Sequence, residues 1–279
     1  MTDMPAHDAV AVILGSAFGA ESLGDLTLER RDVPTPWGPQ TLHRVARTER
    51  PAYVLFRHGS PHRLLPNQIN YRAQAAALRS VGCGALLVTS SVGVLDPSLP
   101  LFRLLLVEDL LMPENRLPDG SACTMFVEPS PHHGHLVLSE GLFSEALSEQ
   151  IRELAEAAGG VHETGVVFAY AGGPRTKTRA ENRLFARLGG QVNSMTLGPE
   201  VVLANELEIP CAGLVAGHKY SVPDLPNLED GGSVEASLAA ARRAMERAVV
   251  AFLRHGEPVA FRNHLFRFDD PNVATEGNP

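Results

Sequence analysis

Short apolar runs that alternate with helical segments constrain the fold of this chain more than any other feature. The apolar runs occupy residues 10–14, 53–56, 85–88, 104–107, 165–170 and 209–216, and a further short run begins at residue 192. Between them, residues with helical spacing predict helices over 67–81, 142–158, 178–188, 199–207 and 233–254. Strands that are apolar throughout are typical of a sheet covered by helices on both faces. We therefore expect an α/β fold, with a mixed, mostly parallel central sheet flanked by helices.

The length of 279 residues is compatible with one large α/β domain. No internal repeat and no low-complexity linker divides the chain. We predict a single domain over residues 1–265 and a polar C-terminal tail over residues 266–279. Segments rich in proline and glycine predict surface loops at 34–39, 114–121 and 129–134.

Charge and hydropathy argue against two classes of partner. The formal net charge is −8, whereas a surface that binds nucleic acid is usually basic. No apolar run approaches the roughly 18 residues of a membrane-spanning helix. The acidic N-terminal sequence MTDMPAHD lacks the apolar core of a signal peptide, which predicts a cytoplasmic protein.

Cysteine and histidine do not indicate a metal site. No CxxC motif is present, and the three cysteines lie far apart, at Cys83, Cys123 and Cys211. We interpret each as a small buried apolar side chain. The cluster His132, His133 and His135 has no acidic or cysteine companions and lies in a proline-rich segment. A solvated loop therefore explains it better than a metal centre.

Polar groups follow three of the predicted strands. Ser16 lies in the glycine-flanked turn GSAFG, Arg57 and His58 follow YVLF, and the run Thr89-Ser90-Ser91 follows ALLV. Ligands of open α/β sheets bind at the carboxyl ends of strands. Guanidinium, imidazole, hydroxyl and exposed backbone N–H groups together suit an anion such as phosphate. A dehydrogenase is not expected, because no GxGxxG turn is followed by an acid about 20 residues later.

The order of these motifs carries a resemblance. LGSAFG is followed by TPWG, RHGSPHRLLPNQINYRA, TSSVGVL, GGPRTKTRAE and NSMTLGPEVVLANE, between about residue 10 and residue 216. This series resembles the trimeric purine nucleoside phosphorylase family, and within it the methylthioadenosine phosphorylase branch. The resemblance implies a homotrimer that binds a nucleoside and inorganic phosphate, with phosphate as co-substrate and no cofactor. It also implies phosphorolysis of the N-glycosidic bond, which gives a free base and a pentose 1-phosphate.

The resemblance assigns roles to individual residues. Its phosphate ligands match Ser16, Arg57, His58, Ser90, Ser91 and Thr196. Met195, with Ser194 beside it, matches the position that packs on the ribose, although a methionine in a short strand is usually core. Glu181 and Glu200 each open a predicted helix, where an acid favours the dipole, and we interpret both as structural.

The base-binding positions depart from the family. A phenylalanine and a hydroxyl or acidic residue are replaced by Thr176 and Lys177. The acids or amide that contact the base elsewhere in the family are replaced by His218, Lys219 and Ser221, in an order that depends on which branch is aligned. Because no carboxylate remains, we expect a carbonyl-rich base such as a 6-oxopurine, and not methylthioadenosine.

Two residues are candidates for catalysis at the leaving base. His218 could donate a proton near neutral pH, and a lysine such as Lys219 could act through charge if burial lowers its pKa. In the opposing interpretation both lysines extend into solvent and contact no ligand. A further alternative is a non-catalytic homologue that binds a phosphate-bearing ligand in a regulatory role. The region after Pro100 differs from the family, so the 5′-substituent is not predicted.

Overall fold

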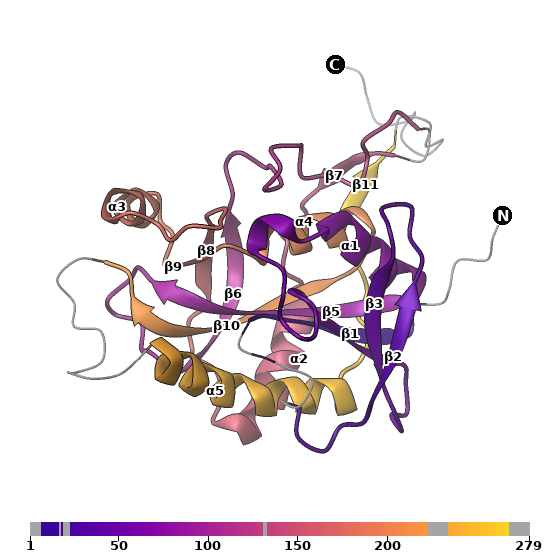
Figure 1. Cartoon of the computed structure of the whole chain (residues 1–279), viewed down its shortest axis with the longest axis horizontal. Helices are drawn as coiled ribbons and strands as arrows, with labels where there is room; N and C mark the ends of the chain where they lie inside the picture. The colour runs from indigo at the N-terminus through magenta and orange to yellow at the C-terminus, as the bar shows by residue number, and fades with distance from the viewer. Residues whose placement is uncertain (1–6, 17, 19–22, 131–132, 223–233, 268–279) are drawn as a thin grey trace.

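The computed structural model describes residues 7–16, 18, 23–130, 133–222 and 234–267. A central sheet runs across the molecule, with helices on both of its faces (Figure 1). Its strands are β1 (Ala9–Leu14), β2 (Leu28–Val33), β3 (Gln40–Val45), β4 (Ala52–Phe56), β5 (Cys83–Val94), β6 (Leu104–Leu111), β8 (Val166–Tyr170), β9 (Val192–Ser194) and β10 (Cys211–Tyr220). A separate pair consists of β7 (His135–Val137) and β11 (His264–Phe266). The helices are α1 (Tyr71–Ser80), α2 (Glu145–Ala155), α3 (Arg179–Arg187), α4 (Gly198–Glu206) and α5 (Val234–His255).

The nine-stranded sheet has the order β10-β6-β8-β9-β5-β1-β4-β3-β2. β5 pairs with β10 as well, so β5, β9, β8, β6 and β10 close into a ring. Parallel pairs join β1 to β4 and β5, β8 to β6 and β9, and β5 to β10. Antiparallel pairs join β3 to β2 and β4, β5 to β9, and β6 to β10. The structure is a single α/β domain with a mixed sheet, which confirms the predicted fold class.

Two apolar cores cover the faces of the sheet. On one face, α1 and α4 contribute residues such as Leu78 and Val201 to a core that includes Phe168. On the other face, α2 and α5 contribute Leu147 and Phe252 to a second core. Figure 1 shows these helix pairs on opposite sides of the strands. Coverage on both faces explains why β1, β4 and residues 85–88 of β5 form apolar runs.

Several predicted boundaries are wrong for tertiary reasons. β5 continues through Thr89–Ser91 to Val94, because β10 supplies backbone partners from Leu86 onwards and β9 pairs with the last two residues. β10 likewise runs to Tyr220, so His218 and Lys219 belong to a strand and not to a following loop. The helix predicted over 67–81 begins only at Tyr71, after a short 3-10 turn at Pro66–Gln68, and the Asn70 side chain caps it by accepting from the Ala73 amide.

Other predictions have mixed outcomes. All three cysteines are buried and free of disulfide bonds, and burial raises the pKa of each thiol, which confirms that they are small buried side chains. The segment 34–39 is confirmed as the connection of the β2–β3 hairpin, which was itself missed. The domain boundary at residue 265 stays a prediction, and most of the predicted tail, like His132, lies outside the described residues.

The described part of the chain lacks two features. It contains no helix that is both long and apolar enough to cross a membrane. Within the same residues, no three His, Cys, Asp or Glu side chains come together in a way that could hold a metal ion.

Candidate active site

One cavity of about 380 Å³ collects every residue that the sequence singled out for substrate binding or catalysis. The phosphate-type positions in its wall are Ser16, Arg57, His58, Ser90, Ser91 and Thr196. The remaining predicted positions in its wall are Thr176, Lys177, Ser194, Met195, His218, Lys219 and Ser221. The roles of these side chains stay predictions, but segments far apart in the chain bring all of them to one space.

The first end of the cavity, which we call the anion end, lies where β1, β4 and β5 meet. The Gly15-Ser16 turn follows β1, and Arg57 follows β4 directly. A Cβ atom on Gly15 would lie 3.1 Å from Arg57 Nη1, so glycine allows the turn to approach the guanidinium closely. Ser90 is nearly buried at this end, and its hydroxyl lies 3.2 Å from that of Ser194.

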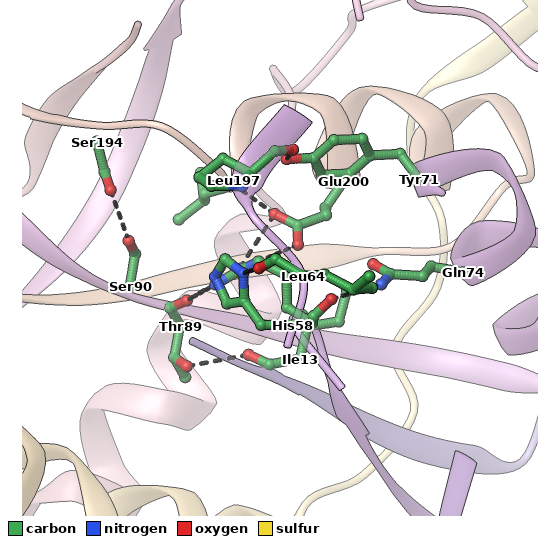
Figure 2. A network of polar contacts seen from close by, with 12 residues as sticks. Ile13, His58, Leu64, Tyr71, Gln74, Thr89, Ser90, Ser194, Leu197 and Glu200 are labelled. Carbon is green, nitrogen blue, oxygen red and sulfur yellow. Dashed lines mark hydrogen bonds and ion pairs between the residues drawn. The ribbon is translucent and has the colours of Figure 1, made fainter. Parts of the chain in front are cut away.

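Arg57 already has protein partners on most of its donors. Its Nε and Nη2 donate to the two carboxylate oxygens of Glu200, and both Nη1 and Nη2 lie 3.0 Å from the Thr89 carbonyl oxygen. The Arg57 and Glu200 side chains are only 1% and 2% exposed. Figure 2 shows this network, with the Glu200 carboxylate also beside the backbone of Leu197, whose N–H it accepts. Glu200 therefore balances the charge of the anion end, a role that its interpretation as a helix-opening acid did not include.

His58 is held as a neutral imidazole at the same end. Its Nδ1 lies 2.8 Å from the carbonyl oxygen of Leu64, which can only accept, so Nδ1 carries the hydrogen and Nε2 is left as an acceptor. Burial, and then the neighbouring Arg57 charge, lower the pKa of His58 to about 4. The ring stacks on that of His62, with centroids 4.5 Å apart. At neutral pH, Nε2 of His58 can thus accept a hydrogen bond from a ligand.

The second end, which we call the base end, lies where β5, β9 and β10 run together. Strand pairing sets Lys219 opposite Gly93, and the Ser221 amide donates to the Val94 carbonyl over 2.7 Å. A Cβ atom on Gly93 would lie 2.2 Å from Ser221 Oγ and 3.1 Å from Asn193 Oδ1. Glycine at position 93 therefore leaves room for the side chains that converge at this end.

The ionisable groups of the base end are partly buried cations and a neutral histidine. Burial, and then the nearby Lys219 charge, lower the pKa of Lys177 to about 8. Burial and both lysines lower the pKa of His218 to about 4. His218 is therefore neutral near pH 7, whereas a histidine that acts as a general acid must first be protonated. Lys177 and Lys219 both line the cavity, and whether they contact a ligand stays a prediction.

Sequence reasoning missed several cavity residues. Asn193 Nδ2 donates to Asn182 Oδ1 over 3.0 Å, and Asn193 Oδ1 has no hydrogen-bond partner within the described structure. The NSMT motif contains Asn193, and α3 contains Asn182, but neither carried a signal of its own. The other missed lining residues are His62, Leu65, Pro66, Gly93 and Pro174. No aspartate or glutamate occurs among the described residues that line the cavity.

The fold and the cavity define an α/β protein with a small-molecule site whose two ends differ in charge balance. Comparison with known proteins gives the class: residues 9–254 match the model of the phosphorylase superfamily. The chain belongs to this superfamily, as an enzyme of the nucleoside phosphorylase type, and such enzymes are pentosyltransferases.

Relatives with two different descriptions match this chain. The chain is 35% identical over 217 residues to a probable S-methyl-5′-thioinosine phosphorylase of Methanopyrus kandleri, covering 76% of this chain and 78% of that protein. A protein of Pseudomonas syringae pv. tomato with the same description is 34% identical, over 68% of this chain and 80% of its own. An S-methyl-5′-thioadenosine phosphorylase of Sclerotinia sclerotiorum is 31% identical, over 72% of this chain and 66% of its own.

Solved structures share the fold. A methylthioadenosine phosphorylase from an antarctic soil metagenomic library has a TM-score of 0.72 at 20% identity and covers 91% of this chain and 93% of its own. Methylthioadenosine phosphorylase from Schistosoma mansoni with adenine has a TM-score of 0.70 at 23% identity, over 88% and 90%. Together with the family match, these comparisons confirm the family resemblance noted in the sequence.

Proposed function

We propose that this protein uses inorganic phosphate to cleave the N-glycosidic bond of a purine-type nucleoside, or of a 5′-modified nucleoside. The products are the free base and a pentose 1-phosphate. The observation that carries this proposal is the single cavity, in which separate strand ends bring anion-binding groups to one end and base-type positions to the other. No step requires a cofactor.

In the proposed reaction, hydrogen phosphate binds at the anion end. Its charged oxygens accept from the hydroxyls of Ser90 and Thr196 and from the remaining Nη1 hydrogen of Arg57. Its single O–H donates to Nε2 of His58, which is free to accept because Nδ1 is bound to Leu64. A phosphate oxygen then forms a bond to C1′ while the C1′–N9 bond breaks, and the electron pair of that bond leaves with the base. Preorganised donors favour this step because they need no rearrangement as the charge moves.

We further propose that the base is a 6-oxopurine. A 6-amino group needs an acceptor, and no described residue lining the cavity offers a carboxylate. The donors of Lys177, Lys219 and Ser221 suit a carbonyl oxygen instead. Two relatives described as probable S-methyl-5′-thioinosine phosphorylases support this choice, because inosine carries a 6-oxopurine. Relatives described as S-methyl-5′-thioadenosine phosphorylases represent the competing base.

A homotrimer is part of the proposal. Large apolar side chains that are about half exposed occur on α3, at Leu184 and Leu188, and around β7, at Val137 and Leu138. Such surfaces are typical of contacts between protein molecules. Light scattering coupled to gel filtration measures the mass directly: we expect three times 30.0 kDa, and a monomer would remove this part of the proposal.

A panel of nucleosides tests the reaction and the base separately. Inosine, adenosine and their 5′-methylthio forms are incubated with the enzyme, with and without phosphate, and the released base is quantified by chromatography. We expect release only with phosphate, and at least about tenfold higher kcat/KM for the 6-oxopurines, the effect of one hydrogen bond to a charged group. Equal turnover of adenine nucleosides would remove the base assignment alone. No turnover of any nucleoside, with phosphate still binding, would favour a non-catalytic homologue with a regulatory role.

A further inference from the structure

Lysine is almost absent from this protein. The chain contains only two lysines, Lys177 and Lys219, and every other basic residue that is not histidine is an arginine. Both lysines line the same cavity, although they come from different segments of the chain. They lie close enough for the charge of Lys219 to lower the pKa of Lys177. The base end is therefore the one place where the molecule concentrates ammonium groups.

The charge of these two ammonium groups is not balanced by the protein. Among the described residues, neither lysine forms an ion pair, and the acid that attracts Lys177, Glu181, is itself bound to Arg175 at 2.7 Å. The anion end differs, because Glu200 neutralises Arg57 there. Two neighbouring cations in a partly buried site repel each other, and an anion between them would remove that cost.

The positions of the two ends indicate which part of a substrate would meet the lysines. Ser90, at the anion end, and Gly93, at the base end, are three residues apart on β5, which corresponds to about 10 Å. In a displacement at C1′, the attacking phosphate and the leaving base lie on opposite sides of that carbon. If the proposed phosphorolysis holds, the departing base therefore lies beside Lys177 and Lys219.

We propose that the preferred leaving group is a purine with carbonyl oxygens at both C2 and C6, which departs as an anion held between Lys177 and Lys219. This inference rests on the proposed phosphorolysis and specifies its substrate class. A phosphate oxygen forms the bond to C1′, the C1′–N9 bond breaks, and its electron pair remains on the base. The resulting negative charge spreads onto the two carbonyl oxygens, and both lysines keep their protons.

Hydrogen-bond chemistry distinguishes this base from its close analogues. A lysine ammonium has three donors and no acceptor. A 2-oxo group accepts from it, a 2-amino group places donor against donor, and a hydrogen at C2 offers nothing. Among 6-oxopurine ribosides, the expected order of kcat/KM is therefore xanthosine, then inosine, then guanosine.

The test compares these three nucleosides in the wild type and in Lys177→Gln, Lys219→Gln and Lys177→Glu. We expect the wild type to favour xanthosine over inosine by at least about tenfold, the effect of a hydrogen bond to a charged group. Each glutamine variant should lower the ratio of xanthosine to inosine by about the same factor. Lys177→Glu should invert the ratio of xanthosine to guanosine, because a carboxylate accepts from a 2-amino group. Ratios within one variant cancel any loss of folded protein.

Arg183→Gln is the matched control, since it removes one positive charge from exposed α3 without touching the cavity. Its three rates should keep the wild-type ratios. The inference is overturned if kcat/KM for inosine or guanosine equals that for xanthosine in the wild type, or if Lys177→Glu leaves the ratios of kcat/KM unchanged. In those cases phosphate-dependent release from inosine would still support the proposed phosphorolysis. Release of the base without phosphate, or no release from any nucleoside, would instead count against the phosphorolysis itself.

Discussion

The two ends of the cavity differ in whether their buried charges have partners within the protein. At the anion end, Arg57 is bonded to Glu200 and to the Thr89 carbonyl before any ligand arrives. At the base end, Lys177 and Lys219 both line the cavity, and neither forms an ion pair with an acid among the described residues. The first arrangement is already satisfied and rigid, and the second is complete only when a ligand supplies acceptors.

This difference separates stability from specificity. Removing a member of a satisfied buried pair leaves an uncompensated charge, which costs folding free energy. Removing one of two repelling cations relieves a cost in the free protein and weakens only the bound state. Variants at the anion end should therefore affect unfolding most, and variants at the base end should affect substrate choice most.

Glu200→Ala should give the largest effect on unfolding. It leaves the Arg57 guanidinium buried without its carboxylate and should lower the free energy of unfolding by about 3–5 kcal/mol. Urea denaturation followed by circular dichroism measures this loss. Glu181→Ala is the matched control, because Glu181 also opens a helix but bonds the exposed Arg175. A loss in Glu200→Ala no larger than in Glu181→Ala would contradict the contrast between the two ends.

Acid should destabilise the folded protein, because each end of the cavity holds a neutral histidine. The pKa of His58 and of His218 is about 4 in the folded protein, compared with 6.5 for an unperturbed histidine. The unfolded chain therefore binds more protons between these values. The stability from each neutral ring is complete above pH 6.5 and is lost as the pH falls towards 4. Between pH 6.5 and 5 we expect a loss of about 1–2 kcal/mol for each histidine.

Urea unfolding at several pH values measures this slope in the wild type, His58→Gln and His218→Gln. Each variant should reduce the slope of unfolding free energy against pH by the contribution of one histidine. The slope should not vanish in the double variant, since burial also lowers the pKa of His43 and His7. Slopes identical to the wild type would show that neither ring is held neutral by its surroundings.

Gly93→Ala should narrow the base end with little effect on folding. The added methyl group would meet the Ser221 hydroxyl, a side chain that can rotate, and the Asn193 side chain. We expect kcat/KM to fall by at least about tenfold, as for a one-methyl mismatch in a pocket, with the urea midpoint nearly unchanged. Gly172→Ala is the control, because its methyl group would have ordinary contact, at 3.6 Å, with the Tyr170 hydroxyl. Similar activity in the two variants would contradict the convergence of side chains at Gly93.

The sequence predicted the apolar strands and helices well, because burial on both faces leaves a strong pattern. It missed β2 and β3; residues Glu29–Asp32 of β2 are exposed and polar, and strand pairing with β3 holds them in place. It also ended β5 at the polar run Thr89–Ser91, since the partners that extend the strand lie far away in the chain, on β9 and β10.

The site shows the same division. Residue types and motif order predicted which side chains meet in the cavity, but not their protonation states or ion pairs. Glu181 and Glu200 look alike as helix-opening acids, yet only Glu200 is buried against a guanidinium. The predicted proton donor His218 is neutral because the two lysines and burial act on it together. Such effects depend on distances between segments, which a linear pattern does not contain.

The smallest expected effect is also the most direct measure of the lysine pair. Burial is the main cause that lowers the pKa of Lys177 to about 8, and the Lys219 charge is the next. Lys219→Gln should therefore raise the pKa of Lys177 by less than burial lowers it. With only two lysines in the chain, reductive methylation with ¹³C-formaldehyde gives an NMR spectrum with two lysine signals and that of the N-terminus, and each variant assigns one. An unchanged titration of Lys177 in Lys219→Gln would mean that the two ammonium groups do not interact. The base end would then lack the unbalanced pair that distinguishes it from Arg57 and Glu200.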